Sequence, residues 1–337
     1  MDIQLFKDIL QMESTSGMEK ELAEMLALRL KTPHNRVKLS DVGDGTRNLL
    51  LTWGNPRVLL CTHLDTVPPY IPPTTEELPD GDIRFLGRGT CDAKGQIFSM
   101  WTACLELERM GLDGFGLLLL AGEETGSWGA KAFRTSHPGA PYVLVGEPTD
   151  NCMVQASKGT KAFEITIDGK AFHSGYPEQG VSAIDRFVDL MNELRQASFP
   201  LDPVLGPTTW NVGKLHSDNP QNILSPSLTC RIYFRTTFAS DEMVKDWLPA
   251  RAKERDWLHV NAIGGDTPME YITMDGIARK TVSFGSDAPQ LTNCPGKMLC
   301  GPGSILVAHR AEEQILLSEL QQAVKNYCKI VQDLLKS

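Results

Sequence analysis

The stretch 84–95, RFLGRGTCDAKG, surrounds a single acid, Asp92, with three glycines, a cysteine and basic residues. Glycine lets a backbone adopt positive φ angles or approach another group closely, so a carboxylate in such a turn can be aimed at a target. Because a carboxylate has two oxygens, it can contact two cations at once. An ordinary loop with an Asp turn is the alternative interpretation of this stretch taken alone.

A histidine and an acid end one apolar run of the chain. In VLLCTHLDTVP (58–68), His63 and Asp65 are two positions apart, so in a strand both side chains lie on one face. The C-terminal ends of strands are where open α/β sheets bind ligands. The pair suits a metal ligand and an acid that orients it. A strand-end histidine with an ordinary hydrogen-bond partner is an equally common explanation.

Further acids follow two other apolar runs. Glu123 and Glu124 come after FGLLLLA, Glu147 comes after YVLV, and His309 stands before the last predicted helix. Adjacent acids at a strand end point to opposite sides, so one can bind a cation while the other acts as a general base. A solvated acidic turn is the alternative. Together with Asp92 and the first histidine, these residues fit two borderline cations that share a bridging carboxylate, with a water between them.

Alternating apolar runs and amphipathic segments up to about residue 155 predict an α/β layer architecture with a mixed, partly parallel sheet covered by helices. Ser16 and Glu19 have the spacing of a capping box ahead of the second helix. The proline-rich segment 68–82 is expected to be an irregular surface loop. The clearest predicted helices are 3–12, 94–110 and 312–336.

The pattern changes after Gln155. The order of predicted elements becomes β-α-β-β-α-β, which is that of a ferredoxin-like α+β unit. We therefore expect a discontinuous catalytic domain, 1–155 and 265–337, with an inserted domain at 156–264.

Composition excludes several classes of protein. The net charge is −9 and the pI is about 5.3, which argues against nucleic-acid or anionic-membrane partners. The N-terminus has neither a basic leader nor a signal-peptide core, so a cytoplasmic location is expected. The eight cysteines contain no CxxC pair and are expected to be reduced. HExxH, GxSxG and P-loop motifs are absent.

Six motifs occur in a fixed order over nearly the whole chain: HLDTVP, GRGTCDAKG, GEETGS, GEPT, GKAFHSGYPEQGVSAI and GPGSILVAHRAEE. With them the sequence resembles the acetylornithine deacetylase / succinyl-diaminopimelate desuccinylase family of two-zinc amidohydrolases. Within that family it is most similar to acetylornithine deacetylase. The resemblance implies a zinc-hydrolase catalytic domain with an inserted lid and dimerisation domain.

The resemblance also implies a ligand set. Asp92 would bridge two zinc ions per subunit, for which cobalt or manganese would be substitutes. His63 and Glu147 would complete one site, and Glu124 and His309 the other. A cis peptide bond is implied after the bridging aspartate.

Catalytic roles follow from the same resemblance. Glu123 would be the general base, Asp65 would orient His63, and His173 of the inserted domain would reach the reacting carbonyl across a homodimer.

Substrate contacts are implied for Asn222 and Arg235 in the inserted domain. The family usually has an acid two residues before this arginine, where this chain has Tyr233. The resemblance therefore does not determine the shape of the substrate pocket.

The implied reaction is zinc-dependent hydrolysis of the amide bond of an N-acyl-amino acid. We expect the substrate to be N-acetylornithine, N-acetylcitrulline or an N-succinyl analogue, and the enzyme to take part in arginine biosynthesis. Succinyl-diaminopimelate desuccinylase, dipeptidase and carboxypeptidase activities are alternatives within the family. A metal-binding protein without turnover is an alternative from another class, but it would have no use for an acid such as Glu123 outside the ligand set.

Overall fold

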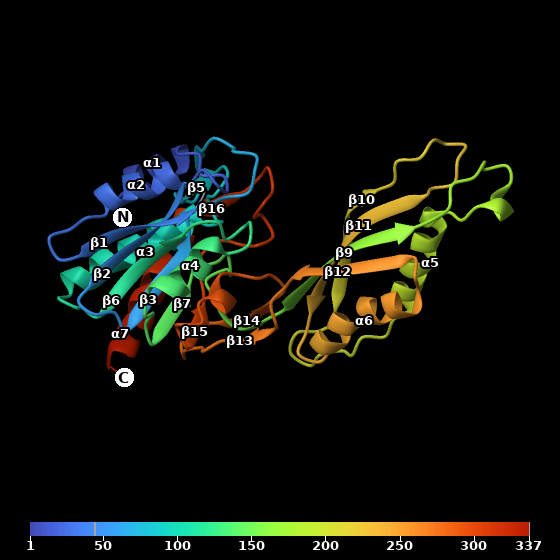
Figure 1. Cartoon of the computed structure of the whole chain (residues 1–337). Helices are drawn as coiled ribbons and strands as arrows, with labels where there is room; N and C mark the ends of the chain where they lie inside the picture. The colour runs from blue at the N-terminus through green and yellow to red at the C-terminus, as the bar shows by residue number, and fades with distance from the viewer. Residues whose placement is uncertain (44, 337) are drawn as a thin grey trace. The chain divides into compact units, whose positions relative to one another are not determined.

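The computed structural model, which describes residues 1–43 and 45–336, contains a six-stranded sheet of order β1-β2-β6-β3-β7-β15 (Figure 1). Its strands β6, β3, β7 and β15 run parallel, and β1 and β2 are antiparallel to their neighbours. The carboxyl ends of the parallel strands therefore meet at one edge. The strands are β1 (Arg36–Gly43), β2 (Thr46–Trp53), β3 (Val58–His63), β6 (Phe115–Leu120), β7 (Tyr142–Val145) and β15 (Gly296–Leu299).

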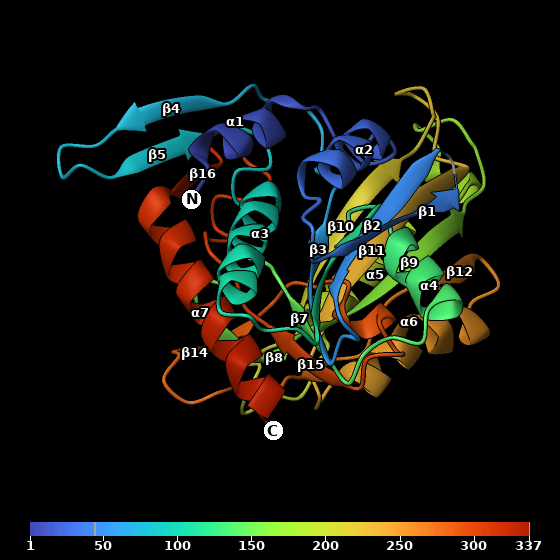
Figure 2. The ribbon, with the colours of Figure 1, turned by 90° about the vertical axis from the view of Figure 1, so that its left-hand side faces the viewer.

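Helices cover both faces of this sheet (Figure 2). Leu49 and Leu51 of β2 and Leu117 of β6 belong to a core shared with α2, α3 and α7, whereas Leu50 and Leu118 face a small cavity lined by Phe133 of α4. This alternation is expected of strands, because successive side chains point to opposite faces. The helices are α1 (Ile3–Gln11), α2 (Lys20–Arg29), α3 (Lys94–Arg109), α4 (Trp128–Ser136) and α7 (Leu317–Lys336).

A three-stranded sheet corrects two predictions. β4 (Thr74–Glu77) lies inside the segment 68–82 that was predicted to be an irregular loop, and it pairs with β5 (Ile83–Leu86), which follows that segment. β5 also pairs with β16 (Gln314–Leu316). The strand β16 occupies residues assigned to the last helix, so α7 begins at Leu317 rather than at 312. Proline restrains only the residues beside it, and the Thr-Thr-Glu-Glu segment between Pro73 and Pro79 contains no proline and is free to pair.

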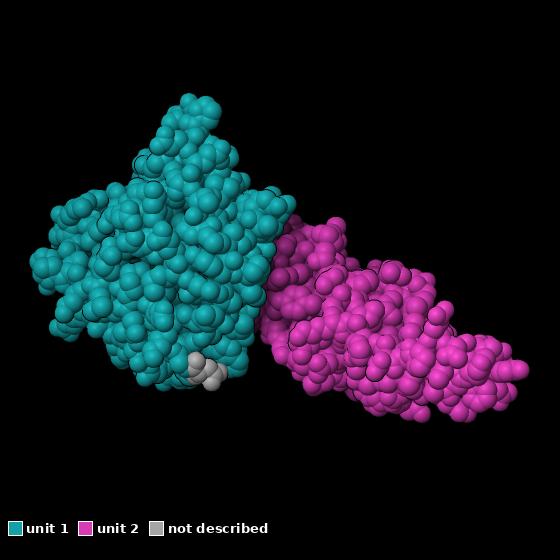
Figure 3. Space-filling model, turned by 90° about the horizontal axis from the view of Figure 1, so that it is seen from above, with its two compact units in different colours: residues 1–155, 271–280, 286–337 teal, residues 156–270, 281–285 magenta. Residues whose placement is uncertain are grey.

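The chain divides into two units, coloured separately in Figure 3. Unit 1 contains residues 1–155, 271–280 and 286–337, and unit 2 contains 156–270 and 281–285. Unit 2 extends beyond the expected boundary at 264 because β13 (Met269–Glu270) pairs with β8 (Met153–Ser157), and because the Lys158 N–H donates to the Val282 carbonyl of β14 (Arg279–Val282).

Unit 2 is built on an antiparallel sheet of order β10-β11-β9-β12. Two helices, α5 and α6, pack on one face of it, around Phe163, Ile232 and Leu248. The β-α-β-β-α-β order is the predicted one. The elements are β9 (Gly159–Asp168), α5 (Ala183–Gln196), β10 (Thr209–His216), β11 (Ser227–Thr236), α6 (Asp241–Glu254) and β12 (Leu258–Gly264).

The predicted fold class, a helix-covered mixed sheet joined to an α+β unit, is confirmed. All eight cysteines are free thiols, as expected. Among the described residues, no helix has both the length and the apolar character needed to span a membrane.

Candidate active site

His63 is the last residue of β3, and its side chain is almost completely buried, with 1% exposed. Its Nδ1 lies 2.9 Å from the carbonyl oxygen of Asp65. Because a carbonyl can only accept, Nδ1 carries a proton, and in the neutral ring Nε2 holds the lone pair. That Nε2 lies 3.0 Å from Oδ1 of Asp92. The imidazole is thus oriented to offer a lone pair toward the central aspartate.

The turn that carries Asp92 depends on close backbone approaches. A Cβ at Gly95 would lie 2.3 Å from the Thr90 carbonyl oxygen, so only glycine fits there. The Asp92–Ala93 peptide bond is cis, as the family resemblance implied. The two carboxylate oxygens of Asp92 face different histidines: Oδ1 faces His63, and Oδ2 lies 3.1 Å from Nε2 of His309. One carboxylate therefore lies between two imidazoles.

His309 lies in a turn between β15 and β16, in the left-handed region at φ 63°. Its Nε2 is 2.8 Å from Oε1 of Glu124 as well as 3.1 Å from Asp92. About half of the imidazole, 47%, is exposed. One nitrogen thus faces two carboxylate oxygens, although a single N–H can point well at only one of them.

The carboxylate of Asp65 holds the two adjacent glutamates by their backbone. Its Oδ1 accepts from the Glu123 N–H at 3.0 Å, and its Oδ2 accepts from the Glu124 N–H at 3.1 Å and the Ser16 hydroxyl at 2.8 Å. The distance from Oδ1 to Nδ1 of His63 is longer, 3.4 Å. The backbone carbonyl of Asp65 therefore orients the histidine, and its carboxylate positions the turn of the two acids.

The predicted capping box at Ser16 and Glu19 is wrong. The helix α2 starts after Glu19, which makes no side-chain cap to it. Glu19 instead accepts from the Gly17 N–H at 2.8 Å and from the Gly122 N–H at 3.1 Å. Both side chains therefore support the turn before Glu123.

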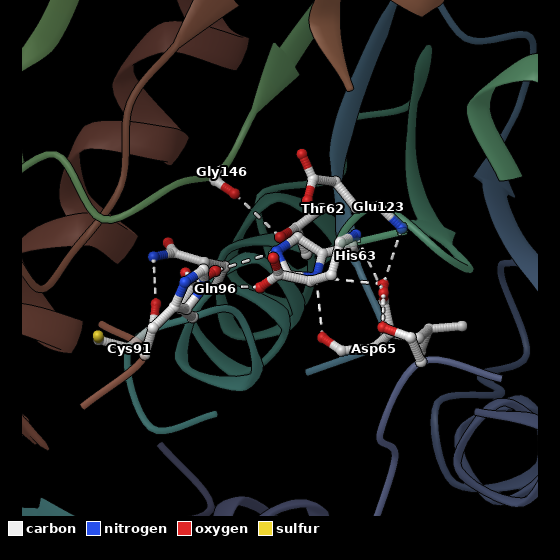
Figure 4. Close-up of polar contacts among 12 residues, drawn as sticks. Thr62, His63, Asp65, Cys91, Gln96, Glu123 and Gly146 are labelled. Carbon is white, nitrogen blue, oxygen red and sulfur yellow. Dashed lines mark hydrogen bonds and ion pairs between the residues drawn. The ribbon is translucent and has the colours of Figure 1, made fainter. Parts of the chain in front are cut away.

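Glu147 follows β7 at the same edge of the sheet. The Thr62 hydroxyl donates to the Gly146 carbonyl at 3.0 Å, which ties the end of β3 to this turn (Figure 4). Glu147 is 4% exposed, and its Oε1 is buried without a hydrogen-bond partner among the described residues. Burying a carboxylate oxygen without a partner costs free energy, so this atom would be stabilised by a cation or a proton.

The pKa values reflect this crowding of charge. Burial alone would raise the pKa of Asp92, but hydrogen bonds from His309 and His63 outweigh it and hold that pKa well below its ordinary value. Hydrogen bonds to Asp92 and to Glu124 raise the pKa of His309 to about 10. Burial would lower the pKa of His63, yet the neighbouring Asp65 and Asp92 raise it well above the ordinary value. Without a metal ion, both imidazoles hold protons against the central carboxylate.

The pKa values of the other buried carboxylates are raised rather than lowered. Burial raises the pKa of Glu123 and of Glu147 well above the ordinary range, and nearby acids add to the rise, although His63 opposes it. Asp287 has the same environment: it is 1% exposed, neither oxygen has a hydrogen-bond partner among the described residues, and burial raises its pKa to about 7. The site thus holds more carboxylates than imidazoles, which favours the binding of cations.

These side chains fit a metal centre. One ligand atom each of His63, Asp92 and Glu124 lies within 4.8 Å of the others. Imidazole nitrogens and carboxylate oxygens are the ligands that zinc takes in hydrolytic sites. A cation between the two imidazoles and the central carboxylate would replace their shared protons. The unpartnered oxygen of Glu147 could serve as a further ligand.

Sequence reasoning missed several residues around the site. Asp287 follows a glycine-serine pair rather than an apolar strand, so no pattern singled it out. Arg88 and Glu313 form a buried ion pair beside Asp92, and both lie inside motifs that were recognised for other residues. Arg88 stands between two glycines, whereas Glu313 follows another acid in a polar stretch and has no distinguishing local signal.

The three predicted site residues of the inserted domain lie in unit 2. His173 and Asn222 come together, because His173 forms a bridge to Ile223 and the Asn222 carbonyl accepts from the Ser174 N–H at 2.9 Å. His173 is exposed, and its Nδ1 accepts from the Gly175 N–H at 3.0 Å.

Arg235 is on the sheet face opposite α5 and α6. Its guanidinium lies 4.9 Å from the ring centroid of Tyr233, two residues earlier on β11. Within the part of the chain that the structure describes, no carboxylate lies within ion-pair distance of it.

Comparison with known proteins identifies the family to which the chain belongs. A family model described as "Peptidase family M20/M25/M40" matches residues 59–333. A probable carboxypeptidase of Talaromyces marneffei is 31% identical over 385 residues, covering 98% of this chain and 85% of that protein. Two solved structures share the fold. A tripeptidase from Staphylococcus aureus has a TM-score of 0.79 at 18% identity, covering 99% of this chain and 98% of that one. An M20 family metallo-carboxypeptidase from Sulfolobus solfataricus has a TM-score of 0.77 at 15% identity, covering 99% of each chain. The chain therefore belongs to peptidase family M20/M25/M40 and is a hydrolase that acts on amide bonds.

Proposed function

We propose that the chain is a two-zinc enzyme that hydrolyses the amide bond of an N-acyl-amino acid, with N-acetylornithine as the first candidate substrate. The observation that carries the proposal is Asp92, whose two oxygens each face the Nε2 of a different histidine. The motifs that resemble acetylornithine deacetylase support the choice of substrate.

His63, Asp92 and Glu147 would hold one zinc ion, and Asp92, Glu124 and His309 the other. Cobalt or manganese would serve in their place, because the same nitrogen and oxygen ligands bind these ions. Bound cations would lower the pKa of a water and polarise the carbonyl of the substrate. The chain's own side chains would transfer the proton, stabilise the oxyanion and bind the substrate.

Glu123 would act as general base and then as general acid. Its backbone is held by Asp65, and its carboxylate is outside the group of ligand atoms around Asp92. A raised pKa suits a carboxylate that must take a proton from water and return it to the leaving amine.

His173 would stabilise the oxyanion. The Gly175 N–H donates to its Nδ1, so the neutral ring carries its proton on Nε2, where it is free to donate to an oxygen. Asn222 would contact the substrate beside it. Arg235, which has an aromatic neighbour in place of an acid, would bind the substrate's free carboxylate.

A carboxypeptidase is the second candidate, favoured by the curated relatives of the chain. The protein from Talaromyces marneffei is named a probable carboxypeptidase, and it covers nearly the whole chain. N-acyl-amino acids and peptide C-termini both present an amide beside a free α-carboxylate, so the proposed site residues serve either reaction. A desuccinylase or dipeptidase would use the same groups.

Amine release decides among these substrates. Zinc-loaded protein is assayed with N-acetylornithine, N-acetylcitrulline, N-succinyl-diaminopimelate, a dipeptide and an N-blocked dipeptide, each alongside its carboxamide analogue. We expect turnover of at least one free-carboxylate compound and loss of turnover with its carboxamide. If none releases amine faster than with zinc-loaded Glu123→Gln protein, the proposed function is wrong. Fastest cleavage of the N-blocked dipeptide would select the carboxypeptidase. Turnover of N-acetylornithine would support a role in arginine biosynthesis.

We also propose a homodimer in which His173 acts on the partner's site. Two inactive variants, His173→Ala and Glu123→Ala, are co-expressed. In a mixed dimer one site would carry both defects and the other none, so roughly a quarter of wild-type activity should return on random mixing. If the histidine acts within its own chain, every site keeps a defect and the mixture stays inactive.

A further inference from the structure

A buried carboxylate holds the backbone on both sides of the Cys91–Asp92 bond. Glu313 has no exposed side-chain surface, and its Oε1 accepts from the Cys91 N–H and from the Asp92 N–H, both at 3.2 Å. Its own backbone carbonyl accepts from the Gly87 N–H at 3.0 Å. The start and the centre of the glycine-rich turn are therefore both attached to one residue.

The second oxygen of that carboxylate is paired with an arginine from the same turn. Arg88 is 3% exposed, and its Nη1 lies 2.5 Å from Oε2 of Glu313. The same Nη1 donates to the carbonyl oxygen of Arg310 at 3.2 Å, and Nε donates to the carbonyl oxygen of Pro69 at 3.3 Å. The guanidinium thus connects the turn of Asp92 to the residue that directly follows His309.

This arrangement links the two turns that carry His309 and Asp92, although more than two hundred residues separate them in the sequence. His309 is in a left-handed conformation, which a non-glycine residue adopts only where its surroundings hold it. The Arg310 carbonyl, one residue further, is held by Arg88. Asp92 is held from its own N–H by Glu313. The 3.1 Å distance between the Asp92 Oδ2 and His309 Nε2 is set between two anchored backbones.

We propose that the Arg88–Glu313 pair is a positioning device for the metal centre, which sets the separation of Asp92 and His309 so that both reach the same cation. The inference rests on the proposed function, because it needs Asp92 and His309 to be ligands. Neither Arg88 nor Glu313 donates an atom to the group around Asp92. Their effect is exerted through the backbone of the two turns. Partners that orient metal ligands without binding the metal typically change metal affinity by about 10–100-fold when removed.

The experiment measures zinc dissociation constants of the full chain by competition with a chelator, together with the unfolding temperature of the zinc-free protein. Glu313→Gln keeps the shape of the side chain but removes its charge, and its amide must turn an N–H toward either Arg88 or the backbone donors. We expect zinc affinity to fall about 10–100-fold. Arg88→Lys keeps the charge but loses the fork that reaches both Glu313 and the Arg310 carbonyl. We expect it to weaken mainly the zinc ion bound by His309.

Asp241→Asn is the matched control. Lys161 and Asp241 form another poorly exposed ion pair, at 2.6 Å, within unit 2. Its loss should lower the unfolding temperature without changing either zinc dissociation constant. A merely structural Arg88–Glu313 pair would behave in the same way, so the contrast between zinc affinity and stability separates the two roles.

Three results would overturn the inference: zinc affinities of Glu313→Gln within twofold of wild type, an equal loss of zinc affinity in the Asp241→Asn control, or unchanged affinity in Arg88→Lys. If Glu313→Gln does not fold, Arg88→Lys decides alone, and a weakened zinc ion supports the proposal. Failure of the wild-type chain to bind zinc would overturn the proposed function together with this inference. Wild-type binding with unchanged variants would overturn only the inference.

Discussion

The two histidines of the site differ in how much protein surrounds them. His63 ends a central strand with 1% of its side chain exposed, and both ring nitrogens have partners. His309 lies in a turn, is 47% exposed, and faces Asp92 and Glu124 with a single nitrogen. Glu147, at 4% exposed, belongs to the buried half of the site.

The difference predicts that the two proposed cation sites have different affinities. In the buried half, β3 and β7 hold the ligands, and a lost cation would leave charges in a poorly solvated place. In the half-exposed part, water can replace a lost cation and the turn can relax. We therefore expect one tightly held zinc ion and one that is lost more readily, and the following predictions test that contrast.

The largest effect is expected at the shared residue. Among the described residues, Asp92 has the only carboxylate that faces both imidazoles, so Asp92→Ala should lose both zinc ions and all measurable amide hydrolysis. Zinc content by atomic absorption, with near-ultraviolet circular dichroism as a check on folding, tests this. Retention of one full zinc ion per folded chain would mean that the two halves are independent and that Asp92 does not bridge them.

The two adjacent glutamates should separate catalysis from metal binding. Glu123→Gln should keep both zinc ions but lose about 10²–10⁴-fold in turnover, because an amide cannot carry the proton. Glu124→Gln should instead weaken the zinc ion of the half-exposed part, since its Oε1 lies against His309. Turnover and zinc content are measured on the same samples. Equal loss of zinc by both variants would refute the division of roles.

Replacing each histidine compares the halves directly. His63→Ala leaves a cavity and unbalanced buried acids, and should destabilise the zinc-free protein by about 3 kcal/mol while removing the tight zinc ion. His309→Ala should remove the weaker zinc ion and destabilise the zinc-free protein less than His63→Ala does, because half of this imidazole is exposed and water fills its place. Denaturant unfolding of chelator-treated protein gives both values. Similar losses would contradict the proposed asymmetry.

The smallest effect is a pH dependence of the zinc-free protein. The pKa of His309 is raised to about 10 in the folded chain, from an ordinary value of 6.5. Its contribution to stability is therefore complete below about pH 6.5 and is lost as the pH rises toward 10. Glu123 and Glu147, whose pKa values are also raised, act in the same direction.

Unfolding temperatures of chelator-treated protein should thus fall between pH 7 and pH 10, and His309→Gln should flatten that fall. Zinc-loaded protein should show less of it, because cations replace the protons. A rise in unfolding temperature over this interval, or an unchanged slope in the variant, would show that the half-exposed imidazole does not hold its proton as described.

Local patterns predicted most of the strands and helices and the collection of side chains at one sheet edge. Apolar runs ending in His63 or preceding Glu123 and Glu147 were sufficient, because parallel strands bring their carboxyl ends together. These residues were therefore found from periodicity, with the family resemblance supplying the roles.

The errors arose where a local motif is used by a distant part of the chain. Ser16 and Glu19 have the spacing of a capping box, yet they bond to Asp65 and Gly122. Residues 314–316 continue a helical pattern, but pairing with β5 draws them into a strand. Asp287 has no local pattern at all, and only burial beside the other acids identifies it. Long-range contacts of this kind are not encoded in sequence spacing.

The discontinuity of unit 1 also has a consequence for synthesis on the ribosome. Residues 1–155 leave the ribosome first, but β15, His309 and α7 are made only after all of residues 156–270. At about 5–20 residues per second, the first segment waits on the order of ten seconds for its missing strand and helix. During that wait β7 has an unpaired edge and α3 lacks the helix that covers it. The nascent chain thus exposes apolar surface during the wait, and the candidate site is completed only after the inserted unit has been made.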